Sequence, residues 1–160
     1  MKSPPSIFLD FDGVLHHANE DLPDSVEALR ANPRLFQWLP HLADALEPYP
    51  DVQIIISSNW RRWFDDSSLR ALLGGLGSRF NGVVSTMGYS RAEEIWMEVH
   101  KRRLEHWLAI DDHESVHAAA QREKRFVACN PELGLSSSAI QFELRTKLLT
   151  VFGKSIQVRM

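Results

Sequence analysis

The sequence predicts an α/β fold, a three-layer α/β sandwich with a mostly parallel five-stranded sheet. Short apolar runs of strand length alternate with segments of helical periodicity in the order βαβαβαβαβα, which is typical of parallel sheets covered by helices. The runs are almost continuously apolar, as expected of strands that are buried on both faces. In such folds, the chemistry lies where the strands end.

The first half of the chain holds two strands and a helix. The strand at 7–9 follows a proline-rich start, and the strand at 52–56 is β-branched and apolar. Between them, Asn32 and Pro33 are typical of a helix N-cap and first helical position. We expect Pro40 to break or kink this helix. Its apolar residues at helical spacing are Leu35, Phe36, Leu39, Leu42, Ala43 and Leu46.

The second half continues the alternation. A helix at 69–73 precedes a short strand at 83–84, and Ser90 is suited to cap the next helix. The fourth and fifth strands are expected at 107–110 and 126–129. A final helix carries Ile140, Leu144, Leu148 and Leu149.

Length and composition exclude several classes of protein. The 160 residues fit one domain, 1–160, with a core over about 6–152. With 44% hydrophobic and 24% charged residues, the chain is not wholly disordered, and its net charge of −3 disfavours a strongly basic nucleic-acid binder. The single Cys129 excludes an intramolecular disulfide, and no zinc-ligand cluster is present. Without a membrane-length apolar run or a signal-peptide pattern, we expect a cytoplasmic protein with no membrane partner.

Polar residues follow three of the predicted strands. Asp10 and Asp12 come after the first, Ser57-Ser58-Asn59 after the second, and Asp111-Asp112 after the fourth. In a parallel sheet, these ends converge on one edge. Four carboxylates in one crevice repel each other unless a cation is present, and an all-oxygen ligand set suits Mg²⁺. A single Asp here would be an ordinary turn or cap residue, but the combination indicates a site.

The motif Asp10-Phe11-Asp12-Gly13-Val14-Leu15 resembles the first motif of the haloacid dehalogenase (HAD) superfamily of phosphohydrolases. Ser58 resembles its second motif, and Asp111-Asp112 its fourth. A narrower branch has similar sequences, namely the HAD domains of Swiss-army-knife RNA repair proteins. The similar segments are Ser57–Arg61, Arg91–Ile95 and Gly134–Ser136. The resemblance implies a Rossmann-like HAD fold and phosphatase activity.

The resemblance also implies a role for each matching residue. Asp10 would be the nucleophile that forms an aspartyl-phosphate, and Asp12 the general acid and base. Asp10, Asp12, Asp111 and Asp112 would hold Mg²⁺, Asp12 through its main-chain carbonyl. Ser58, with Ser57 as the competing choice, would bind a phosphate oxygen together with backbone N–H groups such as those of Phe11 and Asn59.

The third motif departs from the family, which normally has a lysine there. Arg91 stands 20 residues before Asp111 (111 − 91 = 20), and a guanidinium can stabilise phosphate and nucleophile together. We therefore expect Arg91 to take the lysine's place, although its geometry differs.

The residues around the site leave alternatives open. Trp60 and Arg61 could hold a nucleotide at the rim, or Trp60 and Trp63 could pack onto the core. The roles of His16 and His17 remain open between substrate contact and an ordinary surface loop.

The intervals between the motifs leave no room for a folded cap domain. The resemblance then implies an open site that acts on a large substrate, such as a nucleic-acid end or a phosphoprotein, or that borrows a cap from a partner subunit. We expect a phosphorylated substrate such as a nucleotide or a nucleic-acid end. The alternative is a non-catalytic module, derived from the HAD fold or receiver-like, that binds phosphate and metal.

Overall fold

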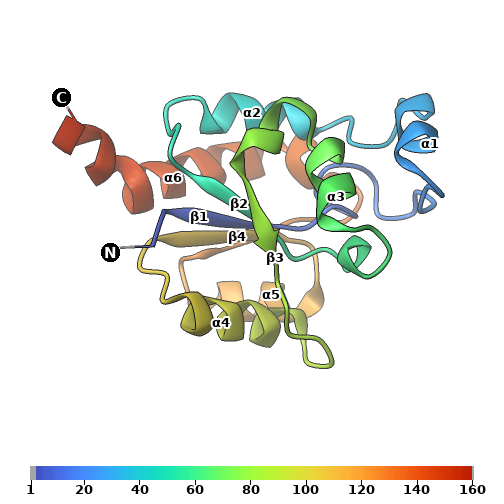
Figure 1. The fold of residues 1–160 in the computed structure, drawn as a ribbon. Coiled ribbons are helices and arrows are strands. Elements are labelled where there is room, and N and C mark those ends of the chain that lie inside the picture. The colour runs from blue at the N-terminus through green and yellow to red at the C-terminus, as the bar shows by residue number, and fades with distance from the viewer. Residues whose placement is uncertain (1–2, 160) are drawn as a thin grey trace.

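The computed structural model describes residues 3–159 and contains one five-stranded sheet (Figure 1). All neighbouring strands are parallel, in the order β3-β2-β1-β4-β5. This arrangement confirms the predicted parallel α/β sheet. The strands are β1 (Ser6–Leu9), β2 (Gln53–Ile56), β3 (Phe80–Val83), β4 (Trp107–Asp111) and β5 (Phe126–Ala128).

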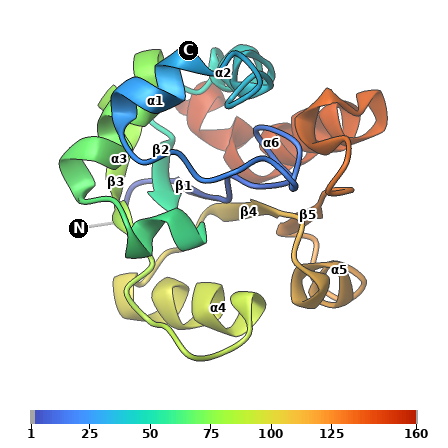
Figure 2. The same cartoon turned by 90° about the vertical axis from the view of Figure 1, so that its right-hand side faces the viewer.

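Helices cover both faces of the sheet and make the fold a three-layer sandwich (Figures 1 and 2). On one face lie α4 (Arg91–Arg102) and α5 (Glu114–Ala120). The other layer contains α1 (Val26–Ala31), α2 (Leu39–Leu46), α3 (Asp66–Leu72) and α6 (Ser138–Arg159). Among the helices of residues 3–159, none combines the length and the apolarity needed to cross a bilayer.

The two cores explain why the strand sequences are continuously apolar. Successive strand side chains point to opposite faces. Ile7 and Leu9 therefore join the core beneath α2 and α6, whereas Phe8 joins the core beneath α4. The same alternation divides β2, where Ile54 and Ile56 lie in one core and Ile55 in the other.

The predicted helix from Asn32 is wrong in its starting point. Asn32 is instead the C-cap of α1, where its N–H donates to the Leu29 carbonyl. The helix begins at Leu39, so that Pro40 falls in the first turn, where its missing N–H costs nothing. The residues between are turns, and Phe36 there has a φ of 58°. In the last helix, Leu149 faces solvent instead of the core.

The segments between the sequence motifs contain no folded cap within the described chain. Between β1 and β2 lie only α1, α2 and their connecting loops, and between β2 and α4 lie only α3, short 3₁₀ turns and β3. The carboxyl ends of the strands are therefore not covered by an inserted domain.

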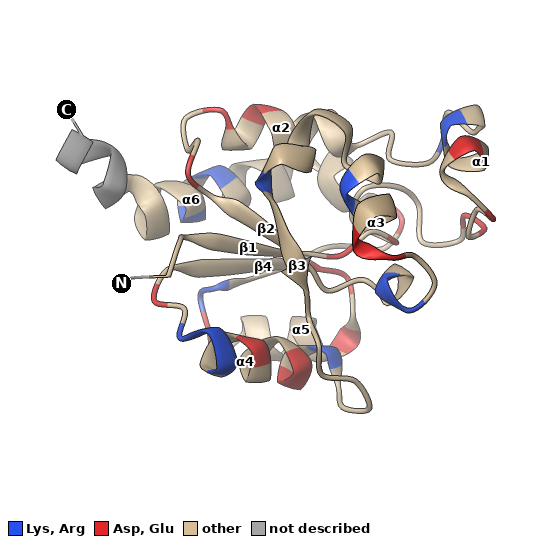
Figure 3. Ribbon diagram, in the orientation of Figure 1, with Lys and Arg blue, Asp and Glu red and all other residues tan. Residues whose placement is uncertain are grey.

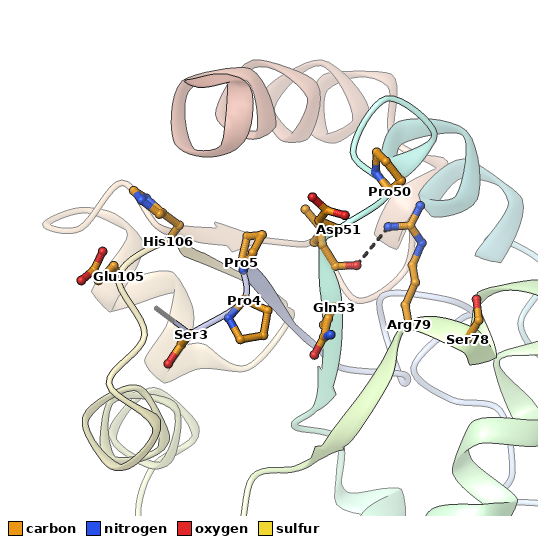
Figure 4. Close-up of a pocket in the computed structure, with 11 residues that line it drawn as sticks. Ser3, Pro4, Pro5, Pro50, Asp51, Gln53, Ser78, Arg79, Glu105 and His106 are labelled. Atoms are coloured by element: carbon orange, nitrogen blue, oxygen red, sulfur yellow. Dashed lines mark hydrogen bonds between the residues drawn. The ribbon is translucent and has the colours of Figure 1, made fainter. Parts of the chain in front are cut away.

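The opposite edge of the sheet, at the amino ends of the strands, has an open cavity of about 790 Å³ (Figure 4). The cation there, Arg79, already donates hydrogen bonds to the main-chain carbonyls of Leu46, Tyr49 and Val52. These are the carbonyls at and after the end of α2, so Arg79 stabilises that helix end.

Gly134, in the 3₁₀ turn η3 (Gly134–Ser136), has a φ of 47°. A Cβ at this position would lie 2.6 Å from both the Val14 carbonyl oxygen and the Trp38 ring. Only glycine therefore allows η3 to approach the loop that follows β1.

We predict that Gly134→Ala lowers the free energy of unfolding by about 2 kcal/mol, because it combines overpacking with an unfavourable φ. Gly75→Ala is the matched control, since its added Cβ would meet nothing within 4 Å and its φ is not positive. Chemical denaturation of both variants tests this. Equal stability of the two variants would contradict it.

Candidate active site

The strand register brings three polar residues level with one another. Leu9 pairs with Ile56 on one side and with Ile110 on the other, so the next residues, Asp10, Ser57 and Asp111, form one row across β2, β1 and β4. Acidic segments follow the ends of β1 and β4 in Figure 3. This is the convergence that the sequence predicts.

Three carboxylates of this edge form a tight cluster. One oxygen each from Asp10, Asp111 and Asp112 lie within 4.8 Å of one another. Asp10 and Asp111 are buried. Burial raises the pKa of Asp10 from 3.8 to about 7, against the lowering effect of Arg91. Burial and the charge of Asp10 likewise raise the pKa of Asp111 to about 7, and burial raises the pKa of Asp112.

Arg91 supplies the positive charge nearest to this cluster. Its Nη1 lies 2.8 Å from Asp111 Oδ2 and 3.3 Å from Asp10 Oδ1. Its Nη2 donates to Asn59 Oδ1 at 3.2 Å. Burial by itself would lower the pKa of Arg91, but the attraction of Asp111 and Asp10 outweighs burial and raises it. Arg91 therefore stays a cation that bridges β1 and β4.

One guanidinium does not balance three carboxylates. The chemistry of this donor set, oxygen only, anionic and largely buried, fits a hard divalent cation. Asp10, Asp111 and Asp112 are the side chains that would hold it. A bound cation would also offset the burial and the mutual repulsion that raise the three pKa values.

Gly13 shapes the same cluster from the backbone. Its φ is 75°, and a Cβ there would collide with the Asp112 carboxylate. Glycine is thus required both for the turn after Asp12 and for the close approach of Asp112.

Asp12 does not join the other three carboxylates. Its Oδ1 lies 2.7 Å from His16 Nε2, and its Oδ2 accepts a hydrogen bond from Trp60 Nε1 at 3.1 Å. The Asp12 side chain keeps 40% of its surface exposed. Of the four side chains predicted to converge, three form the cluster, and the fourth, Asp12, is held beside it by His16 of the same loop and Trp60 of the 3₁₀ turn after β2.

The two serines after β2 have different surroundings. Ser58 is the N-cap of the 3₁₀ helix η1 (Asn59–Arg62), and its Oγ accepts a hydrogen bond from the Trp60 N–H at 3.2 Å. Ser57, in the row with Asp10, has a buried Oγ with no hydrogen-bond partner among the described residues. A buried unpaired hydroxyl is uncommon and costly, and of the two serines Ser57 is the one whose hydroxyl has no partner among the described residues.

Trp60 and Arg61, which the sequence suggests for the rim of the site, are both buried. Trp60 is 1% exposed and packs against Phe11 and Phe36. Phe11 is also buried in the core.

The Arg61 side chain is fully buried and donates to the carbonyls of Ser57, Ser58 and Val84 and to Glu94 Oε1. Its N–H groups are therefore committed within the protein. This geometry gives Arg61 the role of linking the loop after β2 to α4, and it replaces the expected substrate contact.

The exposed aromatic residues near the site are Trp63 and Tyr89. Trp63 is 61% exposed just after η1, and Tyr89 is 57% exposed two residues before Arg91. Tyr89 has no motif around it, so sequence reasoning missed it. Its position in the loop leading to Arg91 is the only signal that could have found it.

The class of domain follows from three features, which are those of a HAD-type domain. They are the strand order of the parallel sheet, the carboxylate cluster at its edge and the Arg91 side chain that bridges Asp10 and Asp111. Over residues 6–140 the sequence matches the model of the family described as the HAD domain in Swiss Army Knife RNA repair proteins, and the chain belongs to this family. No curated protein and no solved structure gives a match to the chain.

Proposed function

We propose that the protein is a Mg²⁺-dependent phosphatase that hydrolyses a phosphomonoester through an aspartyl-phosphate on Asp10. The observation that carries the proposal is the buried Asp10, ion-paired with Arg91 and grouped with Asp111 and Asp112 at the end of β1. Mg²⁺, when bound to these carboxylates, would neutralise part of the charge that makes a phosphate dianion and a carboxylate repel.

In the first step, an Asp10 carboxylate oxygen attacks phosphorus and the bond from phosphorus to the leaving oxygen breaks. Asp12 donates its proton to that oxygen. In the second step, water attacks phosphorus, Asp12 takes a proton from the water, and the Asp10–phosphorus bond breaks to release phosphate. Arg91 contacts Asp10 throughout, and its charge lowers the pKa of Asp10 and favours the ionised nucleophile.

Donors that could bind the phosphate oxygens lie in the row of Asp10 and Ser57 or just after it in the sequence. The N–H groups of Phe11 and Asn59 donate to no acceptor in the described chain, and the Ser57 hydroxyl is unpaired. Ser58, the hydroxyl that the resemblance favours, already caps η1. We therefore propose Ser57 as the better candidate of the two, with Ser58 as its alternative.

For the substrate we propose the phosphate at a nucleic-acid end or on a nucleotide. The site has no inserted cap within the described chain, so a large substrate can reach it. Trp63 and Tyr89 offer exposed aromatic rings near the site on which a base can stack.

We predict that Asp10→Asn lowers the hydrolysis of phenyl phosphate by about 10³-fold or more, since it removes the attacking group. Asp24→Asn, an exposed carboxylate in the loop before α1, is the control and should retain wild-type rates. Assays with Mg²⁺ and with a chelator measure the metal requirement. A wild-type protein that binds phosphate and Mg²⁺ without turnover would favour the non-catalytic module instead.

The two serines give opposite expectations. Ser57→Ala should lower kcat by about 10²-fold, the cost of losing one donor to the transition state, and leave Tm nearly unchanged because its hydroxyl is unpaired. Ser58→Ala should lower stability by about 1 kcal/mol through loss of the cap of η1. Kinetics and thermal melts of both variants decide the assignment, and the reverse pattern would give the phosphate contact to Ser58.

Trp63→Ala should raise KM for a phosphorylated oligonucleotide by about 10-fold, because stacking on an aromatic ring contributes about 1–3 kcal/mol per base. It should leave KM for phenyl phosphate unchanged, since that substrate has no nucleobase to stack. Phe142→Ala, at an exposed aromatic residue on α6, is the control. If Trp63→Ala has the same KM as wild type on oligonucleotides, stacking at this position is refuted.

A further inference from the structure

The buried side chain of His16 lies next to the site and has no part in the steps above. It is 0% exposed, although it follows the Asp10–Asp12 motif by only four residues. Its backbone closes the turn, because the Gly13 N–H donates to the His16 carbonyl at 2.9 Å. This turn brings the His16 side chain back into contact with the Asp12 carboxylate.

The hydrogen bonds of His16 fix its tautomer. The Phe36 main-chain N–H donates to His16 Nδ1 at 3.3 Å. A backbone N–H can only donate, so Nδ1 must carry a lone pair, and the ring hydrogen lies on Nε2. Nε2 is 2.7 Å from Asp12 Oδ1. His16 therefore donates to Asp12.

A strained backbone presents the Phe36 N–H to the ring. The φ of Phe36 is 58°, a left-handed conformation that a bulky residue rarely adopts. The Phe36 ring also stacks on His16, with 5.5 Å between centroids and 15° between planes. Such strain persists only where the surrounding structure enforces it. Here the Phe36 ring contacts the face of the imidazole, and the Phe36 N–H donates to Nδ1 at its edge.

Asp12 is held at both oxygens. Trp60 Nε1 donates to Oδ2, and His16 Nε2 to Oδ1. Each carboxylate oxygen has two acceptor positions, so each retains one for the substrate. The plane of the carboxyl group is fixed while 40% of the side chain remains open to solvent.

We infer that His16 is a positioning residue, which orients the Asp12 carboxyl for proton transfer to the leaving oxygen without touching the substrate itself. The inference deepens the proposed function and rests on it, since it assigns a role in the same reaction. His16 acts by its Nε2–H group, and the aromatic rings around it keep that group on Asp12.

Two amide variants separate the two ends of the imidazole. In His16→Gln, the side-chain NH₂ reaches the position of Nε2 and can still donate to Asp12. In His16→Asn, which is one methylene shorter, the amide oxygen can accept from Phe36, but the NH₂ falls short of Asp12. His100→Asn, an exposed histidine at the far end of α4 from Arg91, controls for loss of a histidine.

The experiment measures kcat/KM with Mg²⁺ on a series of substituted phenyl phosphates, from 4-nitrophenyl to phenyl phosphate. The more basic the leaving phenoxide, the more its departure depends on a proton from Asp12. His16→Asn should lose ~10-fold or more on phenyl phosphate and much less on 4-nitrophenyl phosphate, because general acid catalysis contributes ~10²–10⁴-fold. His16→Gln should restore the wild-type slope, and His100→Asn should match wild type.

The outcomes separate the inference from the proposed function. A wild-type protein that hydrolyses none of these esters refutes the proposed function. An active wild type with an unchanged leaving-group slope in folded His16→Asn, including an equal loss on every ester, overturns the inference. Should His16→Asn not fold, ¹⁵N NMR of the wild-type imidazole decides, because a ring hydrogen on Nδ1 instead of Nε2 would overturn the inference as well.

Discussion

The site is organised around the burial of carboxylates at the ends of two adjacent parallel strands. Asp10 and Asp111 are both buried, and one guanidinium, from Arg91, bridges them. An unpaired buried charge is strongly unfavourable, so strand register, helix position and turn conformation must all agree on this one arrangement. The register makes Asp10 and Asp111 level, and the glycine at position 13 lets Asp112 approach.

A second buried ion pair, between Arg61 and Glu94, lies close to Arg91. Glu94, one turn further along α4, holds Arg61 at 3.0 Å. Burial lowers the pKa of Arg61 and the nearby charge of Arg91 lowers it further, whereas Glu94 raises it. A Ser90 cap starts α4, and Ser115 Oγ accepts the N–H of Ala92. The two arginines therefore sit close together only because carboxylates lie on either side of them.

Much of this could be predicted from the sequence, because strand runs and their polar endings are local patterns. Buried parallel strands place Asp10 and Asp111 together whatever the loops do, and the resemblance to the family's third motif, together with the spacing from Asp111, indicated Arg91. The surroundings of Asp12 could not be predicted, since they depend on Phe36, whose left-handed backbone lies in a segment with helical periodicity. The role of Arg61 could not be predicted for a similar reason: an arginine just after a strand resembles a ligand-binding residue unless its partner, Glu94, is known.

Asp10 and Asp12 differ in the partners that hold their carboxylates. Asp10 is tied to a permanent cation, Arg91, so adding a proton to Asp10 would disrupt an ion pair. Asp12 instead contacts the ring nitrogens of His16 and Trp60, and none of these contacts comes from an arginine. In the proposed reaction, this difference in partners matches the two roles, because one site then holds a nucleophile beside a proton donor.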